Sequence, residues 1–258
     1  MHTYLNACLM KQLSLLLAII IGLPSFALAG DDLKSKAAKY FDKGEEERAL
    51  ETYKKVLEDN NDDVEVLWQS AMLYTRVGDR LDDESQKQEY FEIASELIER
   101  AKHIDDENAD VYFTQAVILG RKADHASTED ALKKAEEIRK YSSKALEVDS
   151  EHEGALHVLG LWHKRMANLS FAERSIVNTL FGGVPEDASN DKAKEYLSNA
   201  ARLDTDMILY QLDLAKFHSE YGNPDEAKQL LEKIQNLDPR FKDDPYHKDE
   251  AEELLTKL

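Results

Sequence analysis

The sequence predicts an all-α protein built of stacked helix pairs, and three observations support this fold class. Small residues recur at regular distances along most of the chain, and apolar residues between them follow a helical period. Only five prolines and ten glycines occur in 258 residues, which permits long helices and argues against a turn-rich β-sandwich. With 42% hydrophobic residues, the chain has enough apolar side chains to form an ordered core.

The N-terminal 29 residues have the composition of a secretion signal. Lys11 precedes an apolar run over residues 13–23, and Ala27-Leu28-Ala29 then forms an A-x-A cleavage site. The run is shorter than the roughly 20 apolar residues that a membrane span needs. We therefore predict a cleaved signal peptide over residues 1–29 and an exported mature domain over residues 30–258, with an uncleaved anchor as the alternative. The expected location is the periplasm, or the medium if the organism has no outer membrane.

Charge and cysteine content restrict the partners of the mature domain. The single cysteine, Cys8, lies within the predicted signal, so the mature domain would have neither disulfides nor thiol chemistry. Without residues 1–29, 32 basic and 52 acidic residues remain, a net charge of -20. This charge disfavours nucleic acid and anionic membrane surfaces as partners. No integral membrane span is expected after signal cleavage.

One small residue in each expected first helix defines the repeat. The spacings between successive members of this set are 34, 45, 44 and 55 residues. The first spacing equals the period of a tetratricopeptide repeat, about 34 residues. In the first and last copies a second small residue follows 12 positions later, as expected for a second helix packed closely on the first. The five first-helix residues are Ala37, Ala71, Ala116, Gly160 and Ala215.

The longer spacings are interpreted as insertions between the two helices of a pair. Acidic, polar stretches at residues 80–88 and 124–129 suit the first two insertions, and recognisable second helices follow them. The residues after Tyr246 are typical of a polar-faced capping helix, which such stacks require at their ends. We predict a tetratricopeptide-like α-solenoid of about five helix pairs with inserted helices or loops and a C-terminal capping helix. A generic helical bundle is the alternative, but it has no reason to repeat near a fixed period.

The longest insertion is the most distinctive part of the chain, and its motifs resemble those of the regulator of microtubule dynamics family. Its tetratricopeptide-like domains carry a similar N-x-S, E-R, T-L-F-G and P series. The resemblance is good over residues 155–205 and weaker over 35–240. Where the family has a Trp after the Ser and a double Pro, this chain has Phe171 and a single Pro. The matching residues are Leu159-Gly160, Trp162, Asn168-Leu169-Ser170, Glu173-Arg174, Thr179-Leu180-Phe181-Gly182 and Pro185.

The resemblance implies a tetratricopeptide-like fold and adds phospholipid to the candidate ligands. The eukaryotic members include organelle-contact proteins, one of which binds phospholipid through such a domain. A microtubule role transfers poorly, because this chain has a secretion signal and no long basic patch to contact an acidic filament. The insertion also has a purely structural interpretation, in which its apolar residues pack an additional helix onto the stack. These residues are Leu169, Phe171, Ile176, Leu180 and Phe181.

A stripe on the first helices is the candidate ligand site. Positions three before, one after and five after each small residue lie four apart, so they share one helix face. In the three central repeats this stripe has a ring-bearing residue, an aliphatic residue and an arginine, in that order. The predicted site consists of Trp68, Met72, Arg76, Phe113, Val117, Arg121, His157, Leu161 and Arg165, with Lys164 beside the last.

The arginines of this stripe allow two interpretations. They could hold an acidic peptide, a chain terminus or a lipid head group along the rim of an apolar groove. Alternatively, they pair with the abundant acids of neighbouring repeats. The Lys and Asn pattern of carboxylate-clamp tetratricopeptide domains is absent, because Lys34 is followed four positions later by Ala38.

The sequence contains no motif of a known catalytic or metal site. There is no H-E-x-x-H, C-x-x-C, G-x-S-x-G or glycine-rich phosphate loop. His152 and His157 are five apart, and His157 and His163 six apart, so neither pair has the i, i+4 spacing of helical metal ligands. We expect no cofactor and no enzyme activity. The leading prediction is an exported scaffold that binds a protein or peptide partner; a lipid carrier using the same groove comes second, and an undetected hydrolase third.

Overall fold

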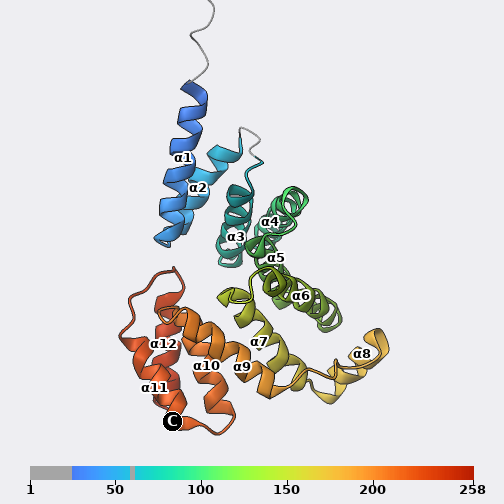
Figure 1. Ribbon diagram of the computed structural model, residues 1–258. Helices are drawn as coiled ribbons and strands as arrows, with labels where there is room; N and C mark the ends of the chain where they lie inside the picture. Colours follow the sequence, from blue (N-terminus) through green and yellow to red (C-terminus); the bar gives the residue numbers. More distant parts are fainter. Residues whose placement is uncertain (1–24, 59–61) are drawn as a thin grey trace, which may run out of the picture.

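The computed structural model describes residues 25–58 and 62–258, with the side chains of the first helix described from residue 32 onward. Within these ranges the chain forms twelve helices and no strand (Figure 1). Most of the predicted signal peptide, residues 1–24, lies outside them, so that prediction stays a prediction.

The helices form five antiparallel pairs, as predicted, and successive pairs stack into a curved solenoid (Figure 1). The pairs are α1 (Ser25–Asp42) with α2 (Glu46–Leu57), α3 (Val64–Asp79) with α4 (Glu84–Ile104), α5 (Ala109–Asp124) with α6 (Thr128–Val148), α7 (Glu153–Ala167) with α9 (Asn190–Leu203), and α10 (Ile208–Glu220) with α11 (Pro224–Gln235). Two helices stand outside this scheme: α8 (Phe171–Phe181) and the C-terminal α12 (Asp244–Leu255). The capping helix is thus present and begins two residues before Tyr246.

The two shorter predicted insertions are not loops. The turns that follow α3 and α5 are brief, and α4 and α6 begin at Glu84 and Thr128. Each of these second helices is 21 residues long, so the additional residues extend the second helix of the pair. The additional residues predicted at 80–88 and 124–129 are present, but they were wrongly expected to separate the two helices of each pair. Polar composition did not distinguish a loop from a solvated helix end, because acidic residues favour the first turn of a helix.

Small residues at the repeat positions allow the paired helices to pack closely. Ala37, Ala71 and Ala215 are fully buried. Gly160 shows the reason: a Cβ atom there would lie 2.7 Å from Cγ of Leu197 on α9. A side chain at this position of α7 would push the two helices apart.

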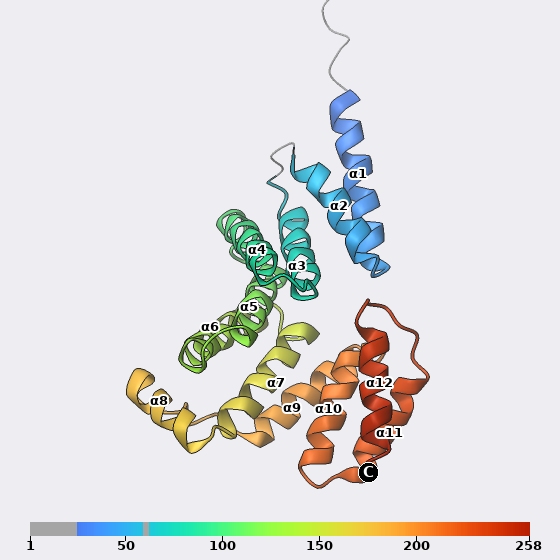
Figure 2. The ribbon, with the colours of Figure 1, turned by 180° about the vertical axis from the view of Figure 1, so that it is seen from behind.

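The α8 insertion is an added helix, but most of its apolar residues do not pack on the stack. It projects from the side of the molecule next to α6 (Figure 1, Figure 2). Leu169 and Val177 anchor it in a buried cluster with Leu132 and Trp162. Phe171 is 91% exposed, and Leu180 and Phe181 are about two-fifths exposed. The prediction that all five apolar residues bury against the stack was wrong, because α8 contributes only one face to the core.

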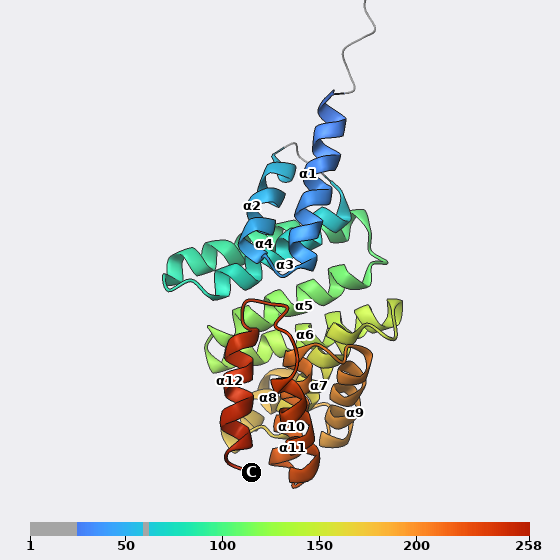
Figure 3. The same cartoon turned by 90° about the vertical axis from the view of Figure 1, so that its left-hand side faces the viewer.

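The loop between α11 and α12, residues 236–243, reaches back to the first helix pair and closes the solenoid into a ring (Figure 2, Figure 3). We call this contact the closure. Its tightest point is Gly44 in the turn between α1 and α2, where φ is +66° and a Cβ atom would overlap the carbonyl oxygen of Arg240. Only glycine suits this position, because it combines left-handed backbone geometry with a close backbone approach.

Candidate functional site

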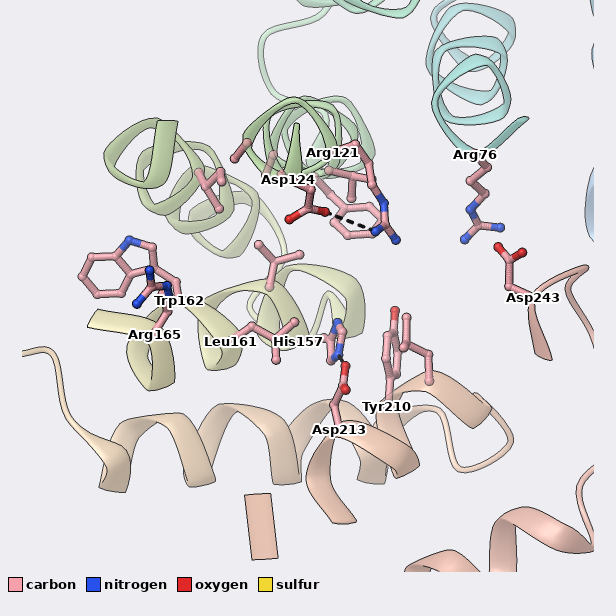
Figure 4. Close-up of a pocket in the computed structure, with 18 of the residues that line it drawn as sticks. Arg76, Arg121, Asp124, His157, Leu161, Trp162, Arg165, Tyr210, Asp213 and Asp243 are labelled. Atoms are coloured by element: carbon pink, nitrogen blue, oxygen red, sulfur yellow. Dashed lines mark hydrogen bonds and ion pairs between the residues drawn. The ribbon is translucent and has the colours of Figure 1, made fainter. Parts of the chain in front are cut away.

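A cavity of about 700 Å³ lies on the concave side of the stack. Helices α3, α5, α6, α7 and α10 form its walls, and α2, the loop 236–243 and α12 complete it at the closure. Figure 4 shows side chains from these separate elements converging on one space. The cavity therefore depends on the curvature of the whole solenoid and not on any single repeat.

Eight of the ten residues of the predicted site line this cavity: Met72, Arg76, Phe113, Val117, Arg121, His157, Leu161 and Arg165. Trp68 does not, because its ring packs edge-on against Phe41 of α1 with 5.8 Å between ring centroids. Lys164 lies in a smaller neighbouring depression and pairs with Glu220 at 2.7 Å. The first-helix stripe is thus brought together in space, while its role in ligand binding stays a prediction.

One wall of the cavity is apolar and lined by unusually small side chains. It lies between α5, α6 and α7, and Leu161 and Trp162 of α7 form its far side (Figure 4). A Cβ atom at Gly120 would meet no other atom within 4 Å, so this glycine faces open space. The small residues of this wall are Ala116, Gly120, Ala123, Ala131 and Ala135. Such a surface has room for an apolar group of a ligand.

The opposite end of the cavity is polar and already satisfied by internal contacts. His157 Nε2 lies 2.8 Å from the Asp213 carboxylate, and its ring packs on Tyr210 with 4.6 Å between centroids. Burial favours the neutral form of Asp213, but the hydrogen bond from His157 and the charge of Lys216 outweigh it and keep its pKa below the ordinary value. Burial raises the pKa of Tyr210. His157 therefore serves first as a structural partner of Asp213.

Each arginine of the stripe has an acidic partner. Arg76 Nη1 lies 3.1 Å from the buried carboxylate of Glu46, on α2 of the preceding repeat. Arg121 pairs with Asp79 of the preceding repeat at 3.5 Å and with Asp124 of its own helix at 3.4 Å. These contacts correspond to the second interpretation of the arginines, in which they pair with acids across repeats.

Arg165 has a different partner, because it joins the solenoid to the α8 insertion. Its guanidinium forms a two-pronged contact with the carboxylate of Glu173. Glu173 in turn accepts the backbone N–H of Ser170 and completes a capping box at the start of α8. The hydrogen bond from Arg165 lowers the pKa of Glu173 to about 2. Arg165 and Arg121 nevertheless keep about half of their side chains exposed, so solvent reaches both.

Sequence reasoning missed the contributions of α6, α10 and the closure. On α10 the cavity is lined by Tyr210 and Asp213, which stand two and three residues before Leu212 and Lys216, the positions that the spacing rule selects in the fifth repeat. Leu212, which the same spacing rule selects, is fully buried in the core. Phe241 and Asp243 come from a loop with no repeat periodicity, and no local sequence signal places them beside α3.

The described part of the chain contains neither a cluster of metal-binding side chains nor a helix that could span a membrane. No group of three or more His, Cys, Asp or Glu side chains gathers there in a way that could hold a metal ion. Among the same residues, no helix combines the length and the apolarity that crossing a bilayer requires.

The fold and the concave cavity define a tetratricopeptide-like helical-repeat protein. A tetratricopeptide protein of the thermophile Thermus thermophilus, TTC0263, has a similar fold, with a TM-score of 0.62 and 17% sequence identity over 86% of this chain and 98% of that chain. Yeast Tom70 is similar with a TM-score of 0.52 and 17% identity, over 88% of this chain and 40% of its own. At these identities the likeness concerns the fold alone.

The family follows from the sequence itself. Residues 33–258 match the family described as Regulator of microtubule dynamics protein 1-3, so the chain belongs to this family and the resemblance noted above is confirmed. Regulator of microtubule dynamics protein 1 of Caenorhabditis elegans is 24% identical over 219 residues, which cover 85% of this chain and 96% of that protein. Regulator of microtubule dynamics protein 3 of Mus musculus is 23% identical over 188 residues, 73% of this chain but 40% of that protein.

Proposed function

We propose that this chain is a non-enzymatic scaffold that holds a segment of a partner protein in its concave cavity. One observation carries the proposal: Leu161 is 37% exposed on the floor between the main cavity and the neighbouring depression, and it lines both. The two hollows therefore share one apolar side chain, with Arg165 beside it. An extended segment can cross this floor and place apolar side chains on either side of Leu161.

The exposed arginines have a secondary role in this proposal. Arg121 can exchange its exposed partner Asp124 for an acidic group of the ligand at small cost, because such surface pairs contribute only about 0–1 kcal/mol. Arg165 is half exposed as well, although its partner Glu173 is only 19% exposed. Arg76 is less free, since its removal would leave the buried Glu46 with Arg80 as its remaining close ionic partner. We expect Arg121→Gln and Arg165→Gln to weaken binding of an acidic segment without unfolding the protein.

A pair of matched variants tests the proposal. Leu161→Glu places a charge on the cavity floor, whereas Leu180→Glu places the same charge on the outer helix α8, where Leu180 is 41% exposed. Proteins captured from the native host by the unmodified chain and identified by mass spectrometry serve as the readout. We expect the enriched partner to be retained by Leu180→Glu and lost with Leu161→Glu, both variants melting as the unmodified chain does. Equal retention by both variants would contradict the proposal.

A lipid ligand is the second candidate, and the wall of small residues around Gly120 supports it. Gly120→Leu would extend a side chain into that space, where its Cβ atom meets no other atom within 4 Å, and would also favour the helix, because glycine is a poor helix former. Solvent extraction and mass spectrometry of the purified protein measure bound phospholipid. Lipid that copurifies with the unmodified chain and is lost from Gly120→Leu would favour a carrier function. A lipid-free unmodified chain would favour the scaffold.

We further propose that the chain is exported and processed after Ala29, on the strength of the A-x-A site behind a short apolar run. N-terminal sequencing of protein from the native host tests this. A mature chain that begins at Gly30 supports export, whereas a chain that retains residues 13–23 in the membrane fraction indicates an anchor. The names of the relatives connect those proteins with microtubule dynamics, and an exported location would separate this chain from such a role.

A further inference from the structure

The closure is held by charged groups from both ends of the repeat stack. Lys242 Nζ lies 2.6 Å from the Glu47 carboxylate, and Arg80 Nη1 lies 3.2 Å from that of Asp243. The Arg76 guanidinium lies over the ring of Phe241, 4.4 Å from its centroid. Of these side chains, Glu47, Lys242 and Asp243 are each about half exposed, so water and salt reach the contact.

Apolar packing does not reinforce this contact. The buried cluster of the N-terminal repeats contains residues of α1 to α5, and the cluster of the C-terminal end contains residues of α10 to α12. Within the described ranges, no buried apolar cluster includes residues from both sides of the closure. Separating the two sides would therefore expose no buried apolar cluster, and the main loss would be that of screened ion pairs and of the contact between Arg76 and the Phe241 ring.

The loop on the C-terminal side keeps its shape without the first repeat. The buried carboxylate of Asp244 accepts the backbone N–H groups of Arg240 and Phe241 at 2.7 and 2.8 Å. The Arg240 guanidinium also pairs with Asp204 at 2.7 Å. Release from the first repeat breaks none of these contacts. The loop can therefore separate and rejoin as a formed element, with little conformational entropy lost on rejoining.

Both sides of the closure also line the cavity: Glu46 and Arg76 from the N-terminal repeats, and Phe241 and Asp243 from the loop. In Figure 4, Arg76 from α3 and Asp243 from the loop extend toward one another at one edge of the space. We propose that the closure is a salt-sensitive latch whose opening admits a ligand to the cavity. The ligand part of this inference rests on the proposed function, whereas the opening itself does not.

A distance measurement tests the opening without any ligand. Spin labels are attached to Glu51→Cys on α2 and Glu252→Cys on α12, both exposed positions, in a full-length Cys8→Ser background. Salt is raised from about 0.05 M to about 1 M, where the screening length falls to about 3 Å. We expect a longer-distance population to grow with salt, with the open-to-closed ratio rising about three- to tenfold. Labels at Glu226→Cys and Glu252→Cys, both on the C-terminal side, are the control and should report one unchanged distance.

A charge exchange provides the matched variant. Lys242→Glu with Asp243→Lys leaves the net charge unchanged but sets like charges against Glu47 and Arg80. We expect this variant to show the longer distance already at low salt, and adding Glu47→Lys should partly restore the shorter one. A distance distribution that is the same at every salt concentration and in the charge-exchanged variant would overturn the latch.

A reversible cross-link tests whether the latch controls access. Glu47→Cys and Lys242→Cys are joined by a short bis-thiosulfonate linker, and association of 1-anilinonaphthalene-8-sulfonate is followed by stopped flow. We expect the cross-link to slow dye association by about tenfold relative to the reductively released protein. Equal rates before and after release would overturn control of access. Failure to capture any partner protein would count against the proposed function and would leave both of these results unaffected.

Discussion

Two contacts of the solenoid are built in opposite ways: the joint between helices α7 and α9, and the closure. At the joint, Gly160 allows Leu197 to approach closely, and Leu197 is fully buried. At the closure, Gly44 allows a close backbone approach, but the surrounding side chains are ionic and partly exposed. The same device, a glycine at a point of contact, thus serves a permanent joint in one place and a separable one in the other.

The difference shows where the free energy of folding resides. Apolar burial at about 25 cal/mol per Å² stabilises the joint under all salt conditions, whereas exposed ion pairs contribute little and are screened. We expect changes at the joint to alter the unfolding transition, and changes at the closure to alter the shape of the folded state.

The largest effect should come from the joint itself. Leu197→Ala removes a fully buried side chain and should lower the free energy of unfolding by about 2–5 kcal/mol. Leu180→Ala makes the same chemical change at a position that is 41% exposed, and should cost less than about 1 kcal/mol. Denaturant unfolding followed by circular dichroism measures both. Similar losses for the two variants would remove the distinction between the stack and its outer helix.

Replacing the glycine of the closure should have the next largest effect. Gly222→Ala is the matched control, because Gly222 has φ +78° but a Cβ atom there would meet no other atom within 4 Å. This control therefore carries only the left-handed penalty of about 1–2 kcal/mol. Gly44→Ala has a similar backbone penalty and must also displace the Arg240 carbonyl. We expect comparable unfolding free energies, with a longer α2–α12 distance only in Gly44→Ala. An unchanged distance would show that the closure tolerates a side chain at Gly44.

Acid should open the closure before it unfolds the stack. The hydrogen bond from Lys242, assisted by the charge of Arg80, keeps the pKa of Glu47 below its ordinary value. A carboxylate with a lowered pKa stabilises its contact above its ordinary pKa, and this contribution is lost as pH falls through the lower, folded-state value. The α2–α12 distance should therefore lengthen between about pH 5 and pH 3 while helical content persists. Glu47→Gln should show a smaller pH dependence over that range, and an identical dependence would exclude Glu47 as its cause.

The smallest effect concerns stability at neutral pH. Lys242→Gln removes one exposed ion pair of the closure and should lower the free energy of unfolding by less than about 1 kcal/mol. Lys228→Gln, which removes an exposed i, i+4 pair within α11, is the control and should behave alike. Chemical denaturation with both variants measures the difference. A loss above about 2 kcal/mol in Lys242→Gln alone would mean that the closure belongs to the cooperative core.

Sequence periodicity predicted the features that depend on neighbouring helices. The small residues at Ala71, Ala116 and Gly160 correctly indicated paired helices, and counting from them found most of the stripe on α3, α5 and α7. These features follow from helix geometry, because residues four apart share a face wherever the helix lies. Trp68 does not line the cavity, because its ring fills the gap to α1.

The remaining lining depends on how the repeats curve, which a repeat period does not specify. On α10 the concave face lies two to three residues before the counted positions, at Tyr210 and Asp213. The closure brings Phe241 beside Arg76 only after all five pairs have stacked. Likewise, the exposure of Phe171 could not be predicted, because an apolar residue at helical spacing is ordinarily a core residue.

The ion pair between Glu47 and Lys242 joins residues 195 positions apart, whereas most other contacts of the solenoid connect adjacent helices. Forming it early in folding would require ordering a very long chain loop for one exposed pair, and the entropy lost would exceed the energy gained. The order of events follows from this difference: the repeats form first through local contacts, and the ring closes last. Substitutions at the closure should then accelerate unfolding or leave the kinetics unchanged, without slowing the folding reaction.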